Sequence, residues 1–183
     1  MPEPPLRPPM RQAILDAAID TFARNPGASL SEVATRAGVG RASLHRHFAS
    51  RADLIAAASG QCMDEIDAAT AAALKDARTA RDRLSRMLEA VVPLGDRYHF
   101  LVSEIVDDES VHKRYEDELD WLGHLADDLK AEGVIAADVP RSWVVANIDA
   151  QTWLAWSEVA AGRLAPAHAA DLALRTLLEG LGP

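Results

Sequence analysis

A chain of 183 residues with 49% hydrophobic residues is long enough for one domain, or two small ones, around a packed core. Its formal net charge of −9 excludes a uniformly basic surface but not a local basic one, so nucleic acid stays open as a partner. No apolar run approaches the roughly twenty residues that span a bilayer, residues 1–5 lack the apolar core of a signal peptide, and Cys62 is the single cysteine, so we expect a cytoplasmic protein without disulfides.

The chain begins with an arm that cannot build a core. Residues 1–9 contain five prolines, so we expect residues 1–10 to form a flexible Pro-rich arm. A first helix is predicted over residues 11–22, because Ile14, Ala17, Ala18, Thr21 and Phe22 fall on one helical stripe before the breakers at residues 25–27.

Two short helices follow, joined by a glycine turn. Ser29 and Glu32 have the spacing of a capping box, which predicts a helix that begins at Leu30. Gly38 ends that helix after about two turns, because glycine adopts the left-handed conformation at little cost. The next helix, residues 41–48, turns Leu44 and Phe48 inward and leaves its other side free.

The free side of this second helix is rich in hydrogen-bond donors. Arg41, Ser43, His45, Arg46 and His47 suit phosphate oxygens and the acceptor edges of guanine. Taken alone, the segment is also compatible with a solvated basic helix. The capped helix before it and the N-cap at Ser50 after it favour a helix-turn-helix that reads duplex DNA.

The run AGVGRASLHRHFASRADLI, residues 37–55, resembles the signature of TetR-family transcriptional regulators. It departs from the family pattern at His45, where a tyrosine is usual, and at Gly40, where a serine is common. The resemblance covers about residues 11–56 and implies a DNA-binding domain over residues 11–50, with an effector-binding and dimerisation domain over residues 51–183. The residues expected to contact DNA are Ser29, Ser31, Gly40, Arg41, Ser43, His45, Arg46, His47 and Arg51.

Charge divides along the same boundary. Residues 1–51 carry seven Lys and Arg against four Asp and Glu, whereas the remainder carries twelve against twenty-four. The expected DNA-binding part is therefore net positive and the body strongly acidic.

The body is predicted to be entirely helical, which makes the whole chain all-α with about nine helices. Strand-like alternation is missing, and proline and glycine breakers separate six further helices. The expected ranges are 51–76, 81–92, 96–106, 110–132 with Gly133 as its cap, 141–162 and 166–181.

The resemblance implies a homodimer through the last two helices. Leu174, Leu177, Leu178 and Leu181 with Ala146, Ala150 and Ala160 would supply the apolar surface, unless these leucines bury within one chain. Two symmetric reading helices would contact a near-palindromic operator, from which a small-molecule effector releases a repressor.

The expected effector pocket consists of large side chains in the body. We take Met63, Met87, Phe100, Trp121, Trp153 and Trp156 as its candidates, with ordinary core packing as the alternative. Trp153 and Trp156 lie three residues apart and would offer flat apolar walls and an N–H donor, which suits a flat or aliphatic ligand with one acceptor.

Three other functions are weaker. His112, Glu116, Asp120, His124 and Asp128 recur every four residues, which suggests either a solvated acidic ridge or a metal-responsive regulator that recruits His99. A binding or interaction protein with a vestigial DNA head is the second alternative. No catalytic constellation is apparent, so neither an enzyme nor a cofactor is expected.

Overall fold

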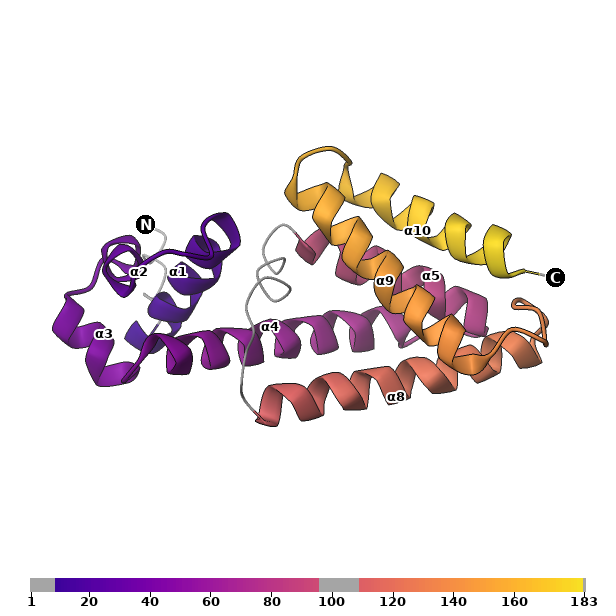
Figure 1. Cartoon of the computed structure of the whole chain (residues 1–183), viewed down its shortest axis with the longest axis horizontal. Helices are drawn as coiled ribbons and strands as arrows, with labels where there is room; N and C mark the ends of the chain where they lie inside the picture. The colour runs from indigo at the N-terminus through magenta and orange to yellow at the C-terminus, as the bar shows by residue number, and fades with distance from the viewer. Residues whose placement is uncertain (1–8, 96–108, 183) are drawn as a thin grey trace, which may run out of the picture.

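The structure, a computed structural model, describes residues 9–95 and 109–182. Within them every regular element is helical (Figure 1). The predicted arm up to residue 8, the predicted helix over residues 96–106, and the candidates Phe100 and His99 lie outside the described residues. The elements are α1 Met10–Arg24, α2 Leu30–Ala37, α3 Arg41–His47, α4 Arg51–Leu74, α5 Ala80–Val91, the short 3-10 helix η1 Val92–Leu94, α8 Glu109–Ala131, α9 Arg141–Ala160 and α10 Pro166–Leu181.

The helices begin where the sequence provides caps. Ser50 closes a capping box with Asp53 at the start of α4, and the Thr79 hydroxyl accepts from the backbone of Asp82 at the start of α5. Each described helix predicted from the pattern is confirmed to within two residues at both ends. The all-helical prediction is therefore confirmed, with caps and breakers as its physical basis.

Helices α1, α2 and α3 and the first half of α4 form the head, at the left of Figure 1. Its core contains Ile14, Phe22, Val33 and Leu44, all at most 1% exposed. The core continues beyond residue 50, because Leu54, Ala58 and Cys62 of α4 are buried in it. Helices α1, α2 and α3 thus pack on the first half of α4 through one continuous apolar core.

The second half of α4 packs with α5, α8, α9 and α10 to form the body. Its largest fully buried side chains are Leu84, Leu88, Leu125, Leu129 and Ile135. In Figure 1, α4 runs from the head along the length of the body. Its Ile66 packs against both cores, so α4 is the shared element of the two halves.

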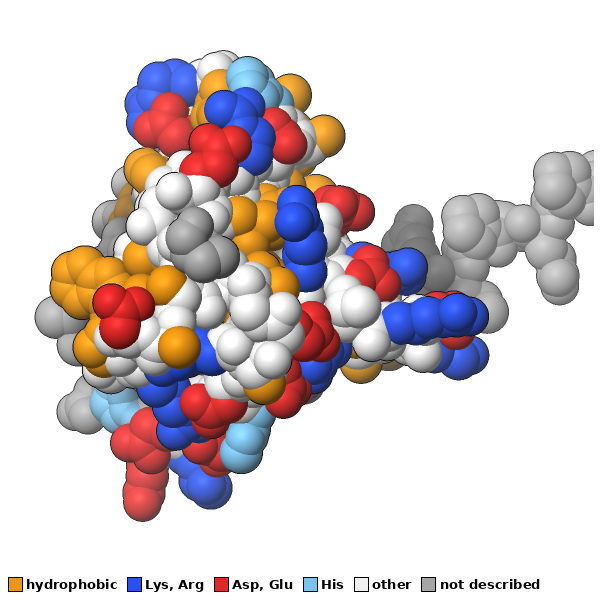
Figure 2. Space-filling model, turned by 90° about the vertical axis from the view of Figure 1, so that its right-hand side faces the viewer, with side chains coloured by type: hydrophobic (Ala, Val, Ile, Leu, Met, Phe, Trp, Pro, Cys, Tyr) orange, Lys and Arg blue, Asp and Glu red, His pale blue; other side chains and the backbone are white. Residues whose placement is uncertain are grey.

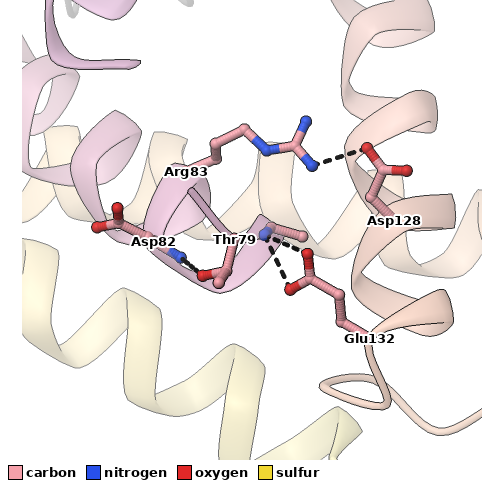
Figure 3. A network of polar contacts seen from close by, with 6 residues as sticks. Thr79, Asp82, Arg83, Asp128 and Glu132 are labelled. Atoms are coloured by element: carbon pink, nitrogen blue, oxygen red, sulfur yellow. Dashed lines mark hydrogen bonds and ion pairs between the residues drawn. The ribbon is translucent and has the colours of Figure 1, made fainter. Parts of the chain in front are cut away.

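A polar network joins the start of α5 to the end of α8 (Figure 3). Both carboxylate oxygens of Glu132 accept from the backbone N–H of Ala80, at 2.8 and 2.9 Å, and Arg83 donates to Asp128 at 2.7 Å. The Glu132 carboxylate stabilises orphan N–H groups at a helix N-terminus. This contact sets the spacing of two helices that both line the cavity described below.

None of the helices within residues 9–95 and 109–182 combines the length and the apolar character needed to cross a membrane.

Candidate functional site

Helix α3 presents its polar side to solvent. Leu44 is 1% exposed and Phe48, just after the helix, is 4% exposed, and both are part of the head core. Arg41, His45 and Arg46 are exposed, as are Ala42 and His47, whereas Ser43 is half-buried. The helix therefore displays a surface of donors with a small residue among them, as the sequence predicts.

The preceding helix is held by the expected cap. The Ser29 N–H donates to Glu32 Oε2 at 2.7 Å, and the Glu32 N–H donates to Ser29 Oγ at 3.3 Å. The Ser29 hydroxyl also donates to Glu32 Oε2, at 2.8 Å, and the two bonds from Ser29 to this carboxylate lower the pKa of Glu32, because they stabilise its charged form. Gly38 ends α2 in the left-handed region, at φ 67°. The predicted capping box and glycine turn are both confirmed.

Two of the predicted DNA-contact arginines are held by neighbouring hydroxyls. Arg41 donates to Ser31 Oγ from Nε at 2.9 Å and from Nη2 at 2.6 Å, and Arg46 donates to Ser43 Oγ at 2.7 Å. A hollow of about 280 Å³ between α2 and α3 is lined by Ser29, Leu30, Ser31, Arg41, Leu44 and His45. The Ser31 bond orients the Arg41 guanidinium along the outer surface of the head.

Arg51 and Gly40 lie differently. The Arg51 guanidinium is 4.9 Å from the centre of the Phe22 ring, and it donates to the Pro26 carbonyl, so it is engaged within the head. Gly40 is the N-cap of α3 and has open space where a Cβ would stand. For both residues a contact with DNA stays a prediction.

The body contains an open cavity of about 640 Å³. Its walls come from α4, α5, α8 and α9. Five of the six predicted pocket residues lie in these walls, namely Met63, Met87, Trp121, Trp153 and Trp156. The sixth, Phe100, lies outside the described residues. The structure thus brings together side chains from helices far apart in the sequence, and their binding of a ligand stays a proposal.

The donor role expected of the tryptophan pair is wrong. Trp153 donates its Nε1–H to Asp149 Oδ1 at 3.1 Å, and Trp156 donates to the Val91 carbonyl at 2.8 Å. The two rings meet edge to face, with centroids 4.6 Å apart. The two indole N–H groups bond within the protein because a buried donor without an acceptor destabilises the fold. The pair offers an aromatic wall without a free donor.

Sequence reasoning missed the acidic groups of the cavity. Asp149 on α9 accepts from both Trp153 and the Tyr115 hydroxyl, the latter at 3.0 Å. Glu118 on α8 and Asp67 on α4 also line the cavity. Arg114 binds Asp67 at 2.6 Å and Asp64 at 2.8 Å. A signal was available, because Asp149 precedes Trp153 by one helical turn and Glu118 follows Tyr115 by three residues.

The electrostatics of these groups follow from their crowding. Glu118 is exposed at the cavity wall, where partial desolvation, and then the nearby charges of Asp149 and Asp67, raise its pKa to about 7. Burial raises the pKa of Asp149 as well, although its two hydrogen bonds act in the opposite direction. The pKa of Tyr115 rises to about 12, through burial and the Asp149 charge. The cavity holds more negative charge than its surroundings stabilise.

The acidic ridge of α8 is solvated. His112, Glu116, Asp120, His124 and Asp128 are all exposed. Among residues 9–95 and 109–182, no group of three or more His, Cys, Asp or Glu is placed to hold a metal ion. His99 lies outside those ranges, so the described part of the chain gives no support to the metal-responsive alternative.

Helix α9 leaves an apolar stripe uncovered. Trp143 is 59% exposed and Leu154 is 52% exposed, with the exposed Ala146 and Ala150 between them. Ala160 at the end of the helix is also exposed. Figure 2, which shows the end of the body away from the head, has hydrophobic side chains gathered at its left edge among mixed charges.

The leucines of α10 pack mostly within their own chain. Leu177 is 2% exposed, and Leu174, Leu178 and Leu181 pack against the body core. The alternative reading, in which these leucines bury within one chain, therefore accounts for much of that set.

Comparison with known proteins finds a family match in the head of the chain. Residues 14–58 match the family described as bacterial regulatory proteins, tetR family. The HTH-type transcriptional repressor LfrR of Mycolicibacterium smegmatis is 36% identical over 94 residues, which cover 51% of this chain and 50% of that protein. The HTH-type transcriptional regulator BetI of Rhizobium meliloti is 31% identical over 48% of this chain and 44% of its own length. The matches span about half the length of these curated relatives.

Solved structures share the fold over nearly the whole chain. The TetR-like regulator LfrR from Mycobacterium smegmatis, in complex with proflavine, has a TM-score of 0.77 at 24% identity and covers 95% of this chain and 97% of that one. The ketosteroid transcriptional regulator KstR2 of Mycobacterium tuberculosis has a TM-score of 0.78 at 18% identity, with 97% of each chain covered. At these identities the likeness concerns the fold alone.

Proposed function

Because residues 14–58 match the family described as bacterial regulatory proteins, tetR family, we propose that this chain is a ligand-responsive transcriptional repressor that binds operator DNA as a homodimer. The observation that carries the proposal is the exposed basic surface of α3 on a capped helix-turn-helix. A role on operator DNA implies the cytoplasm. The relatives are regulators, and we propose no enzymatic activity.

Arg41 and Arg46 are the proposed readers of base edges and phosphates. Both guanidiniums are exposed and held by single hydroxyls, which DNA oxygens can replace or supplement. Ser31 and Arg51 would contact the DNA backbone near the starts of α2 and α4, and the further proposed contacts are Ser29, Gly40, Ser43, His45 and His47. The net positive head would bring this surface to an acidic duplex despite the acidic body.

Dimerisation would double the surface that reads DNA. The exposed stripe on α9, with Trp143 and Leu154 at its two ends, is the surface proposed to meet the same stripe of a second copy. Two α3 helices would then lie about one helical turn of DNA apart, roughly 34 to 36 Å, and read a near-palindromic site.

Release of DNA would follow from a ligand in the cavity. Met63, Ile66 and Asp67 on α4 line the cavity, and the same helix carries Leu54 and Ala58 in the core of the head. A ligand that favours a different placement of α4 would therefore favour a different placement of α3. The structure of LfrR with proflavine supports a small organic molecule as the class of effector.

The test is retention of the full chain on duplex DNA that the protein itself has selected from a random pool. Wild-type binding should fall steeply with salt concentration, because phosphate contacts release counterions. Arg46→Ala should weaken binding about tenfold, whereas Arg81→Ala, which removes an exposed arginine from α5, should leave it unchanged. An affinity for the duplex that changes neither with salt concentration nor on Arg46→Ala would favour the alternative in which the head is vestigial.

A further inference from the structure

Within residues 9–95 and 109–182, one carboxylate of the cavity has no counter-ion. Glu118 makes no hydrogen bond or ion pair among the described residues, and Arg114 is the charged group nearest to offsetting it. That guanidinium is already engaged, because it donates to Asp64, Asp67 and the Gly60 carbonyl. Glu118 therefore faces the cavity without a partner in the part of the chain that the structure describes.

The second central carboxylate adds to this negative charge. Asp149 accepts two hydrogen bonds from neutral groups, Tyr115 and Trp153, which orient it without neutralising it. A fourth acidic residue of the wall, Asp117, pairs with Lys113 on the outer side of α8. The charge left unbalanced is thus concentrated on Glu118 and Asp149, from helices on two sides of the cavity.

The rest of the wall is largely apolar and aromatic, and four of its donors are engaged within the protein. The Nε1–H groups of Trp153 and Trp156 and the hydroxyls of Tyr115 and Thr152 all donate within the protein. A neutral ligand that relies on an acceptor would therefore find these donors occupied. The faces of aromatic rings carry negative potential and attract cations.

From this geometry we propose that the cavity binds a flat, hydrophobic organic cation, with Glu118 as its counter-ion, Asp149 as a second negative group, and Trp153 and Trp156 as its aromatic wall. The proposal deepens the proposed function, on which it rests for the regulatory meaning of the bound molecule. The sequence predicts a ligand that accepts a hydrogen bond from tryptophan, whereas the structure favours a ligand that carries a positive charge.

The ionisation of the site agrees with this assignment. The raised pKa of Glu118 means that the cavity destabilises the charged form of this carboxylate. A cation within the cavity removes that destabilisation and is attracted by the same charge. A neutral molecule of the same shape would bury the carboxylate further without compensating it.

The experiment compares two tricyclic probes of nearly the same shape. The permanent cation 10-methylacridinium and the neutral 10-methylacridone, which carries a carbonyl acceptor, are titrated into the full chain at pH 8. Binding is followed by quenching of tryptophan fluorescence and by calorimetry. We expect the cation to bind at least tenfold more tightly than the neutral probe. Equal affinities, or tighter binding of the acridone, would overturn the proposal.

Matched variants assign the effect to one carboxylate. Glu118→Gln should weaken binding of the cation at least tenfold, which corresponds to about 1.4 kcal/mol, and should not weaken binding of the neutral probe. Glu116→Gln removes the same charge from the exposed side of α8 and should change neither affinity. A Glu118→Gln protein that keeps its helical circular dichroism and binds the cation like wild type would overturn the role of Glu118.

A last arm separates this inference from the proposed function. The cation is added to the full chain on its selected duplex, and release is measured beside direct binding. Binding of the duplex with no affinity for the cation would overturn the ligand class and leave the DNA-binding role in place. Affinity for the cation in a chain that retains no duplex would overturn the regulator and leave the cavity assignment in place.

Discussion

The head and the cavity differ in how their functional groups are brought together. In the head, the cap, the turn and the donors of α3 lie within residues 29–47, and each side chain acts close to its place in the sequence. In the cavity, Met63, Met87, Glu118 and Trp153 come from four helices and meet only through tertiary packing. A short motif therefore reveals a surface, whereas a cavity depends on how helices pack.

The largest expected effect tests the head as a self-contained surface. Replacing both Arg41 and Arg46 with alanine should weaken binding to the selected duplex about 100-fold, because each lost contact is worth about 1–3 kcal/mol. Cation affinity should not change, because both residues lie on α3, outside the cavity. Fluorescence anisotropy with labelled duplex, beside the acridinium titration, measures both, and a parallel loss of cation binding would break the comparison.

The pH dependence of cation binding tests the cavity as an electrostatic site. Glu118 has a pKa of about 7 in the empty protein, so affinity should rise about tenfold between pH 6 and pH 8 as the carboxylate ionises. The charged groups that face it are Asp149 on α9, Asp67 on α4 and Arg114 on α8. In Glu118→Gln the slope should disappear when the titration is repeated at each pH.

A stability measurement sharpens the same contrast. Because the folded pKa of Glu118 lies above its ordinary value of 4.5, the cost of its charge is absent below about pH 4.5 and complete above about pH 7. Glu118→Gln should therefore stabilise the empty protein at pH 8, by about 1 kcal/mol once screening by solvent in the open cavity is allowed for. Thermal unfolding should show Tm raised by about 2 to 4 °C. A lower Tm at pH 8 would contradict the assigned cost.

The smallest expected effect concerns the hydroxyl that orients Arg41. Ser31→Ala removes the hydroxyl that accepts two hydrogen bonds from the Arg41 guanidinium, and it should weaken duplex binding about threefold, since the guanidinium itself remains. Thr35→Ala is a suitable control, because the Thr35 hydroxyl donates only to its own helix at Ser31 O. Anisotropy at fixed salt distinguishes the two, and equal effects would point to helix stability instead of Arg41 placement.

The same difference explains what the sequence predicted. Helix ends were accessible because Ser29, Gly38 and Ser50 act on residues next to them. Large apolar residues such as Trp153 could be proposed for the cavity from size alone. The hydrogen bonds that engage its N–H group, and the isolation of Glu118, depend on which helices meet, and that information is spread over the whole chain.

The position of Ile66, which packs against both cores, limits how such proteins can be recombined. A chimera joined at residue 50 would take the head without Leu54, Ala58 and Cys62, the α4 side chains that complete its interior. The segment that must be exchanged as one unit therefore includes the first half of α4. A chimera between relatives must also preserve the helical register of α4. A chimera that joins a new effector-binding body to this head should therefore have its junction beyond Ile66. It should also keep the packing of Ile66 against both the head core and the body core.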